Sequence, residues 1–138
     1  MIKNRNLREI DVGIWEGRLV EEVIKNYPEK FEMYRTKAGL FKFEGGESFM
    51  ELCERALKCL SEIGEENDGK TVVIGTHGGV IGRLTALWSG VDISSLKRVP
   101  TVPNCSITVI RYDKGDIEVV MKGYAEHLTV SVTEEGIR

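Results

Sequence analysis

One short stretch of this chain combines a histidine with two glycines in a pattern that suits anion binding. The stretch is Thr76-His77-Gly78-Gly79. A protonated imidazole offers hydrogen-bond donors and a positive charge. The two glycines let the main chain turn sharply from one element into the next. These residue types, in this order, predict half of a phosphate-binding site.

The elements on either side would place this histidine where ligands bind. The run 71–75 is short, apolar and β-branched, which predicts a strand buried on both faces. The run 80–88 has helical spacing and stops before Gly90, a C-cap candidate. Open α/β sheets bind ligands at the carboxyl ends of their strands, and a helix N-terminus attracts anions. The alternative is that His77 caps a buried strand and the glycines serve a tight turn.

Three further helices and a hairpin are predicted along the chain. Helical spacing over 19–26 is followed by a second short helix over 28–37, with proline in its first turn. Ser48 and Glu51 form a capping box that opens a helix with a broad apolar stripe. The runs 105–110 and 117–121 flank a turn containing Gly115, which predicts a hairpin.

Composition sets bounds on the class of protein. The chain has 138 residues, 41% hydrophobic and 30% charged, which fits one soluble domain, 1–138. A net charge of −3 argues against a nucleic-acid surface. No apolar stretch reaches the roughly 20 residues of a membrane helix, so no membrane partner is expected. The start has no apolar signal region, and three scattered cysteines are typical of reduced thiols. We therefore expect a cytoplasmic protein.

Several motifs, in order along the whole chain, resemble those of the histidine phosphatase superfamily, the phosphoglycerate-mutase-like proteins. The resemblance rests on the acidic loop Leu7–Gly17, the helix start Gly46-Glu47-Ser48, Arg55 in that helix, the His77 motif, the strand Asn104–Thr108 and the ending Ala125–Leu128. It implies an α/β fold with a mostly parallel three-layer sheet and flanking helices.

The resemblance also implies a chemistry and roles for three residues. Family members hydrolyse phosphomonoesters through a phosphohistidine intermediate. Glu9 matches the acid/base carboxylate that protonates the leaving oxygen. His77 matches the second histidine, which stabilises the transferring phosphoryl group, and the Gly78 main chain would line the same phosphate-binding pocket. A phosphorylated small molecule is the implied substrate, with no metal and no other cofactor.

One departure from the family pattern affects the expected activity. Members begin with a strand ending in Arg-His-Gly, whose histidine is the nucleophile, but the only histidines here are His77 and His127. An N-terminal βαβ unit is therefore expected to be missing, which makes this a truncated domain, inactive or incomplete as this chain. Arg83 also stands one residue later than the family arginine, so no place in the site is assigned to it.

Three interpretations follow for the chain as a whole. It is a fragment of a phosphatase, or a non-catalytic phosphate-binding or interaction module, or one half of a split enzyme. An incomplete sheet exposes a strand edge, so we expect a homo-oligomer or a partner that supplies the missing segment.

Three single residues also have alternative roles. Glu9 could be a surface carboxylate, Glu47 a helix N-terminal carboxylate, and His127 a hydrogen-bonded residue near the C-terminus.

Overall fold

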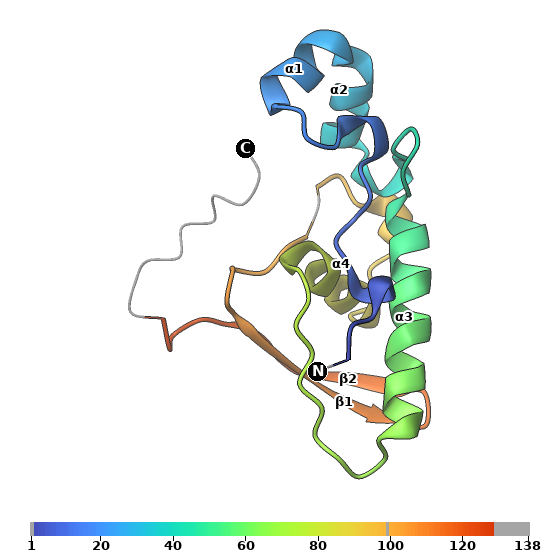
Figure 1. Cartoon of the computed structure of the whole chain (residues 1–138), viewed down its shortest axis with the longest axis vertical. Coiled ribbons are helices and arrows are strands. Elements are labelled where there is room, and N and C mark those ends of the chain that lie inside the picture. Colours follow the sequence, from blue (N-terminus) through green and yellow to red (C-terminus); the bar gives the residue numbers. More distant parts are fainter. Residues whose placement is uncertain (1, 99, 129–138) are drawn as a thin grey trace.

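Helices dominate the regular structure of the chain. The computed structural model describes residues 2–98 and 100–128. The helices and strands of these residues are α1 (Val20–Asn26), α2 (Pro28–Thr36), α3 (Phe49–Glu66), α4 (Gly78–Trp88), β1 (Ile107–Asp113) and β2 (Asp116–Tyr124). Short 3-10 turns lie at Arg5–Leu7, Gly13–Trp15, Ala38–Leu40 and Ile93–Ser95. Figure 1 shows α1 and α2 at one end of the long helix α3 and the hairpin at its other end.

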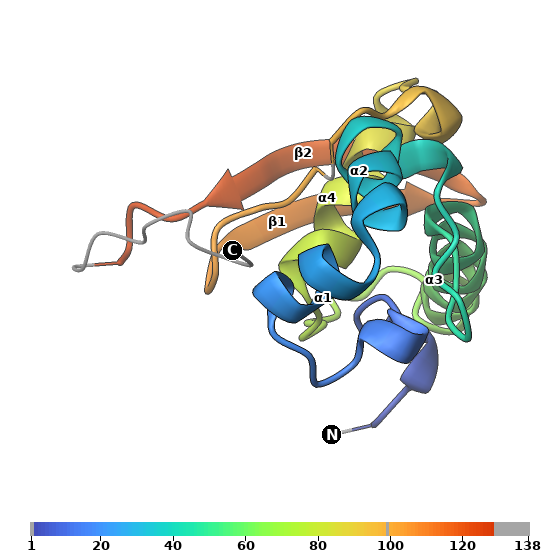
Figure 2. The same ribbon diagram turned by 90° about the horizontal axis from the view of Figure 1, so that it is seen from above.

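Helix α3 is the element on which the rest of the core packs. Its capping box is formed as predicted: the Ser48 hydroxyl accepts from the Glu51 N–H at 3.2 Å, and the Glu51 carboxylate accepts from the Ser48 N–H at 2.7 Å. The predicted apolar stripe is buried, and its buried members are Phe49, Leu52, Cys53, Ala56 and Cys59. Helix α4 contacts both α3 and β2 (Figure 2).

An aromatic cluster joins the N-terminal loop to α2 and to the segment before α3. The Trp15 ring lies 5.2–6.2 Å, centroid to centroid, from the rings of Phe31, Tyr34, Phe41 and Phe43. Tilted and edge-on pairs of this kind add to the stabilisation from burial alone. The cluster therefore fixes the loop that carries Glu9 against the core.

The predicted hairpin is confirmed. Strands β1 and β2 pair antiparallel, with Asp113 opposite Asp116. The two turn residues, Lys114 and Gly115, have φ of 49° and 99°. Positive φ at both positions gives a turn whose twist matches that of paired strands. The Tyr112 ring of β1 packs directly over Gly64, where a Cβ atom would come within 2.4 Å of the ring.

The prediction of a buried strand at 71–75 is wrong. The segment is extended but belongs to no sheet, and Val73 is 94% exposed. A strand is buried only when neighbouring strands and helices cover it, and this segment has no paired neighbour among the described residues. Those residues contain one two-stranded antiparallel sheet, so the mostly parallel sheet stays a prediction.

Two smaller expectations concern membranes and thiols. No helix within 2–98 and 100–128 is both long and apolar enough to cross a bilayer. Cys53 and Cys59 are buried, whereas Cys105 is exposed and has a left-handed φ of 57°.

Candidate functional site

His77 occupies the N-cap of α4. Its main chain is extended, with φ −113° and ψ 150°, and its carbonyl accepts the Ile81 N–H at 3.1 Å. The side chain is exposed. The first N–H groups of the helix, starting at Gly78, have no carbonyl partner within the helix. The imidazole and these N–H groups therefore share the positive end of the helix dipole.

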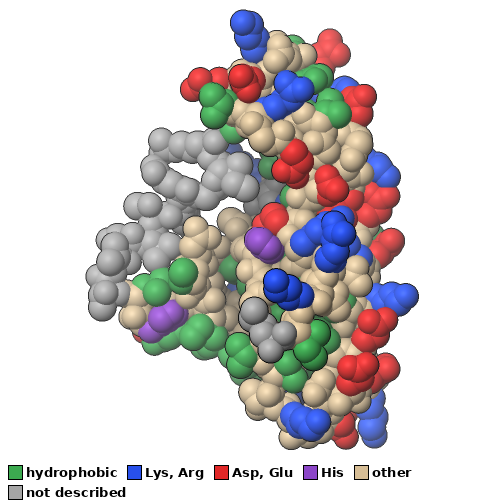
Figure 3. Space-filling view, in the orientation of Figure 1, with side chains coloured by type: hydrophobic (Ala, Val, Ile, Leu, Met, Phe, Trp, Pro, Cys, Tyr) green, Lys and Arg blue, Asp and Glu red, His purple; other side chains and the backbone are tan. Residues whose placement is uncertain are grey.

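The carboxylate of Glu9 lies against the first turn of the same helix. A Cβ atom built on Gly79 would come within 2.8 Å of both Glu9 oxygens and 2.5 Å of the Arg83 Nη1 atom. One oxygen of Glu9 accepts the Ile10 N–H at 2.9 Å. The structure thus brings Glu9 to the helix end that His77 begins, as the resemblance implies. Figure 3 shows acidic and basic side chains gathered on the face of the molecule that it draws.

Arg83 lies beneath this carboxylate, which the sequence analysis did not expect. Its Nη1 atom is 3.8 Å from Glu9 Oε1, and its guanidinium stands 3.9 Å from the Phe49 ring centroid. The residue is only 3% exposed, and neither Nε nor Nη1 has a hydrogen-bond partner among the described residues. Burial lowers the pKa of Arg83, while the charge of Glu9 opposes that shift.

Helix geometry explains how Arg83 reaches the site. Residues four apart lie on one face of a helix, so Arg83 shares the face of Gly79, directly against Glu9. Gly82 lies on the neighbouring face of α4, which packs against residue 100: a Cβ atom on Gly82 would come within 2.2 Å of the Pro100 carbonyl oxygen. An arginine at 82 would therefore collide with residue 100. The spacing from Gly79 to Arg83 was the signal in the sequence that could have identified it.

Gly78 has a packing role as well as a place at the helix end. A Cβ atom there would lie 2.8 Å from the Val102 carbonyl oxygen and 3.0 Å from Thr101 Oγ1. Such distances are too short for a side chain, so glycine lets the segment around residue 102 pass close to the helix. The close packing at Gly78 is thus a structural reason for a glycine at this position, and its place in a phosphate-binding pocket stays a prediction.

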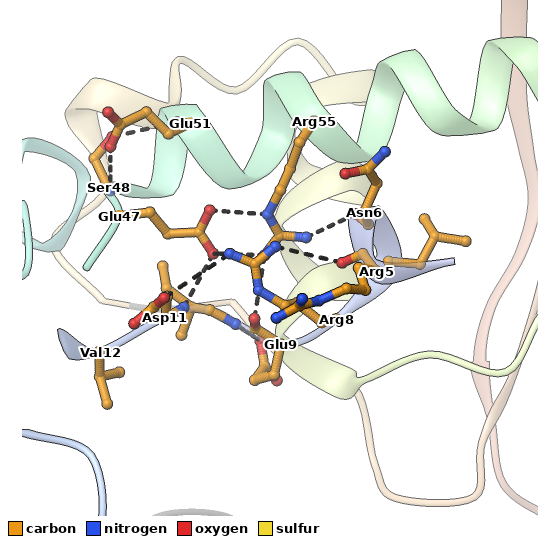
Figure 4. Close-up of polar contacts among 12 residues, drawn as sticks. Arg5, Asn6, Arg8, Glu9, Asp11, Val12, Glu47, Ser48, Glu51 and Arg55 are labelled. Atoms are coloured by element: carbon orange, nitrogen blue, oxygen red, sulfur yellow. Dashed lines mark hydrogen bonds and ion pairs between the residues drawn. The ribbon is translucent and has the colours of Figure 1, made fainter. Parts of the chain in front are cut away.

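A second arginine, Arg55 of α3, fixes the loop that carries Glu9. Its guanidinium donates to both oxygens of Glu47, at 2.5 and 2.8 Å. It also donates to the carbonyl oxygens of Asn6, at 2.7 Å, and Glu9, at 3.1 Å. The Asp11 N–H adds a bond to Glu47 at 3.0 Å. Figure 4 shows these contacts converging from α3 and the N-terminal loop.

The other candidate residues lie apart from this arrangement. His127 stacks on Tyr124, with ring centroids 5.6 Å apart. Within the described residues no group of three or more histidine, cysteine, aspartate or glutamate side chains is placed to hold a metal ion. Thr76 donates from its hydroxyl to the Leu7 carbonyl at 2.7 Å, which ties the segment before His77 to the N-terminal loop.

Comparison with known proteins decides the family. The model of the histidine phosphatase superfamily (branch 1) matches residues 1–124. The chain belongs to the histidine phosphatase superfamily. It is 35% identical over 94 residues to phosphoserine phosphatase 1 of Hydrogenobacter thermophilus, covering 68% of this chain and 44% of the relative. It is 31% identical over 117 residues to phosphoglycerate mutase-like protein 4 of Arabidopsis thaliana, covering 84% of this chain and 49% of the relative.

Solved structures give the same α/β fold class. The protein YhfR of Bacillus stearothermophilus is 31% identical and superposes with a TM-score of 0.82, over 91% of this chain and 62% of that one. A mycobacterial glucosyl-3-phosphoglycerate phosphatase, 20% identical, shares the fold with a TM-score of 0.71, over 88% of this chain and 64% of that one. The chain thus spans about half the length of the two sequence relatives and under two thirds of both structures.

Glu47 proves to be an ion-pair partner rather than only a helix-end carboxylate. Burial alone would raise its pKa, but the hydrogen bond from Arg55, the Asp11 N–H and the charges of Arg55 and Arg8 together lower it. A carboxyl whose pKa is lower in the folded chain stabilises the fold above its unfolded pKa of about 4.5, and that contribution is lost as the pH falls through the folded value.

We therefore expect the free energy of unfolding to fall as the pH drops below about 4.5, and to fall less in Glu47→Gln. Urea unfolding of both proteins between pH 7 and pH 2 measures the difference. Glu51, whose pKa is lowered to about 2 chiefly by its hydrogen bond with Lys42, titrates in both proteins and cancels from the comparison. Parallel pH profiles for the two proteins would contradict the assignment to Glu47.

Proposed function

We propose that the chain carries the acid/base and charge-stabilising half of a phosphomonoester hydrolase that works through phosphohistidine chemistry. The observation that carries this proposal is the Glu9 carboxylate against the first turn of the helix that His77 begins. Membership of the superfamily supports it. Two relatives are named phosphoserine phosphatase and phosphoglycerate mutase-like protein, and these names support phosphate esters as substrates of this chain.

The proposed steps divide between this chain and a nucleophilic histidine outside it. The ester's P–O bond breaks while a P–N bond forms on that histidine, and Glu9 gives its proton to the leaving oxygen. His77 and the N–H groups from Gly78 onward stabilise the charge on the phosphoryl oxygens. Glu9 then accepts a proton from water as the water oxygen forms a bond to phosphorus, the P–N bond breaks, and phosphate and the free histidine are released. The two steps together return the residues of this chain to their starting protonation states.

We propose that the site of this chain is incomplete because it lacks the nucleophilic histidine. The sequence has two histidines, His77 and His127, and His127 stacks on Tyr124. We propose that a further polypeptide segment completes the single domain 1–138 and its mostly parallel sheet, and that the protein works in the cytoplasm.

A second candidate function is a non-catalytic phosphate-binding or interaction module. The unpartnered N–H groups of Arg83 and the free end of α4 suit an anion without requiring turnover. This candidate and the first differ in one respect: the first gains activity when the missing segment is supplied, and the second does not.

The test uses the chain as it is, with p-nitrophenyl phosphate for turnover and inorganic phosphate for binding. We expect no turnover, and phosphate-dependent shifts of the His77 imidazole signals in NMR spectra. His77→Ala should weaken phosphate binding at least tenfold. His127→Ala is the matched control and should leave binding unchanged, because that ring lies on Tyr124, away from α4.

Two outcomes would contradict these proposals. Phosphate binding that is equal in wild type and His77→Ala contradicts both candidates. Turnover by the wild type that disappears in His77→Ala contradicts the need for a second histidine and makes His77 itself the nucleophile.

A further inference from the structure

The buried charge of Arg83 has one carboxylate within reach. Its side chain is 3% exposed, and its Nη1 atom lies 3.8 Å from Glu9 Oε1. Among the described residues, Arg83 forms no other ion pair within 4.0 Å. A charge that is buried without hydrogen-bond partners costs free energy, and the Nε and Nη1 atoms have no such partner in that part of the chain. Glu9 is therefore the group that compensates the charge of Arg83.

Glu9 in turn has few restraints of its own. Its side chain is 33% exposed, and among the described residues its carboxylate accepts one hydrogen bond, from the adjacent Ile10 N–H. An unrestrained glutamate side chain samples several rotamers. If Glu9 turned toward solvent, the buried charge of Arg83 would lose its compensation, which is strongly destabilising. Arg83 therefore restrains Glu9 through charge.

Aromatic packing holds Arg83 itself in place. Its guanidinium carbon lies 3.9 Å from the centroid of the Phe49 ring, a cation–π contact. Phe49 is fully buried, and its ring lies 6.4 Å from that of Tyr34 and 6.3 Å from that of Phe43. The cation thus stands on a packed support, so the carboxylate that it attracts has a defined position as well.

Gly79 leaves the space in which the two charges meet. It lies four residues before Arg83, on the same face of α4. A Cβ atom there would stand 2.5 Å from Arg83 Nη1 and 2.8 Å from both carboxylate oxygens of Glu9. These atoms are the ends of flexible side chains, so an alanine at this position would displace them and leave the helix intact. The position of the pair therefore depends on the missing side chain.

We propose that Arg83 and Gly79 are positioning residues for the acid/base carboxylate: the charge of Arg83 holds Glu9 over the first turn of α4, in the space that Gly79 leaves open. Arg83 lies beneath Glu9 and acts through it, without touching the substrate. This inference rests on the proposed function for the acid/base role of Glu9. The restraint itself involves no phosphate.

The first experiment fills the space and keeps both charges. The rotamers of Glu9 are read by NMR, from three-bond coupling constants of its methylene protons, in the whole chain and in phosphate-free buffer. We expect the couplings of a single rotamer in the wild type and their loss in Gly79→Ala. Gly75→Ala is the matched control and should keep the wild-type couplings, since a Cβ atom on Gly75 would meet nothing within 4 Å.

The second experiment removes the charge. Arg83→Met keeps a long side chain in the same place and should give Glu9 couplings averaged over several rotamers. Arg83→Lys keeps a positive charge and should restore the couplings of the wild type. Arg8→Met is the control, because Arg8 precedes Glu9 in the chain but its guanidinium lies 4.0 Å from Glu47 instead. It should leave the Glu9 couplings unchanged.

A third measurement leaves Arg83 in place, so that the test stands even if Arg83→Met does not fold. Glu9→Gln removes the carboxylate charge at a partly exposed position. The Nε–Hε signal of Arg83 should then shift in the NMR spectrum. The corresponding signal of Arg55 is the internal control and should stay where it is, because its Nε donates to Glu47 at 2.8 Å.

Four results would overturn the proposal. They are averaged Glu9 couplings in the wild type, wild-type couplings in Gly79→Ala or in Arg83→Met, equal averaging in Arg83→Lys and Arg83→Met, and an unmoved Arg83 signal in Glu9→Gln. A purely structural role of Arg83 would change the stability of the chain and leave the rotamers of Glu9 as they are. Failure of phosphate binding at His77 affects none of these readouts, so the two proposals fail separately.

Discussion

Arg55→Met is expected to lower the free energy of unfolding by about 3 kcal/mol, because removing one partner of a buried ion pair leaves the other charge uncompensated. The side chains of Arg55 and Glu47 are only 13% and 12% exposed. The substitution also removes the donors to the Asn6 and Glu9 carbonyls. Urea unfolding monitored by circular dichroism measures the loss.

The control for this prediction is an ion pair of similar geometry at the surface. Arg35 contacts Glu32 through two bonds of 3.0 Å, but both side chains are more than half exposed. Arg35→Met should therefore change the stability far less than Arg55→Met does, because solvent screens an exposed ion pair. Equal losses in the two variants would show that burial of the Arg55 pair has no energetic importance. A loss near zero for Arg55→Met would contradict its role in fixing the Glu9 loop.

Gly13→Ala is expected to cost about 3 kcal/mol, the sum of a left-handed main chain and a collision. Gly13 has φ +56°, and a Cβ atom there would lie 2.0 Å from the Glu44 carbonyl oxygen and 2.6 Å from the Gly46 nitrogen. The Ile14 N–H donates to that same Glu44 carbonyl at 2.9 Å. The loops around Gly13 and Glu44 cannot move apart to relieve the collision without losing this hydrogen bond.

Gly17→Ala separates the two contributions. Gly17 has φ +70°, and a Cβ atom there would meet nothing within 4 Å. Only the conformational cost remains, about 1 kcal/mol. Thermal and urea unfolding of both variants give the comparison. If the two alanine variants lose equal stability, the close approach of the loops at Gly13 contributes nothing.

The helices and the hairpin could be predicted from sequence because local signals define them. The Ser48–Glu51 capping box, the proline at the start of α2 and the turn residue Gly115 each act within a few residues. The structure confirms all three. Glu9 was singled out through the resemblance of its loop rather than through any local signal, and the structure places its carboxylate beside the first turn of α4.

The state of 71–75 could not be predicted in the same way. Its β-branched run does favour an extended chain, and the chain is extended. Burial, however, depends on neighbours that the run itself does not encode. Arg83 and Glu47 were misjudged for a related reason: their partners, Glu9 and Arg55, lie far away in sequence, and long-range ion pairs leave no periodic pattern.

The two tryptophans of the chain occupy different parts of the structure. Trp15 lies in the aromatic cluster that holds the acidic loop, whereas Trp88 lines the groove between 71–76 and β1. Indole emission depends on local polarity, so each ring reports on its own surroundings. With one tryptophan replaced by phenylalanine at a time, the remaining fluorescence distinguishes release of the acidic loop from a change in the groove. The chain thus carries two natural fluorescent probes, Trp15 for the acidic loop and Trp88 for the groove.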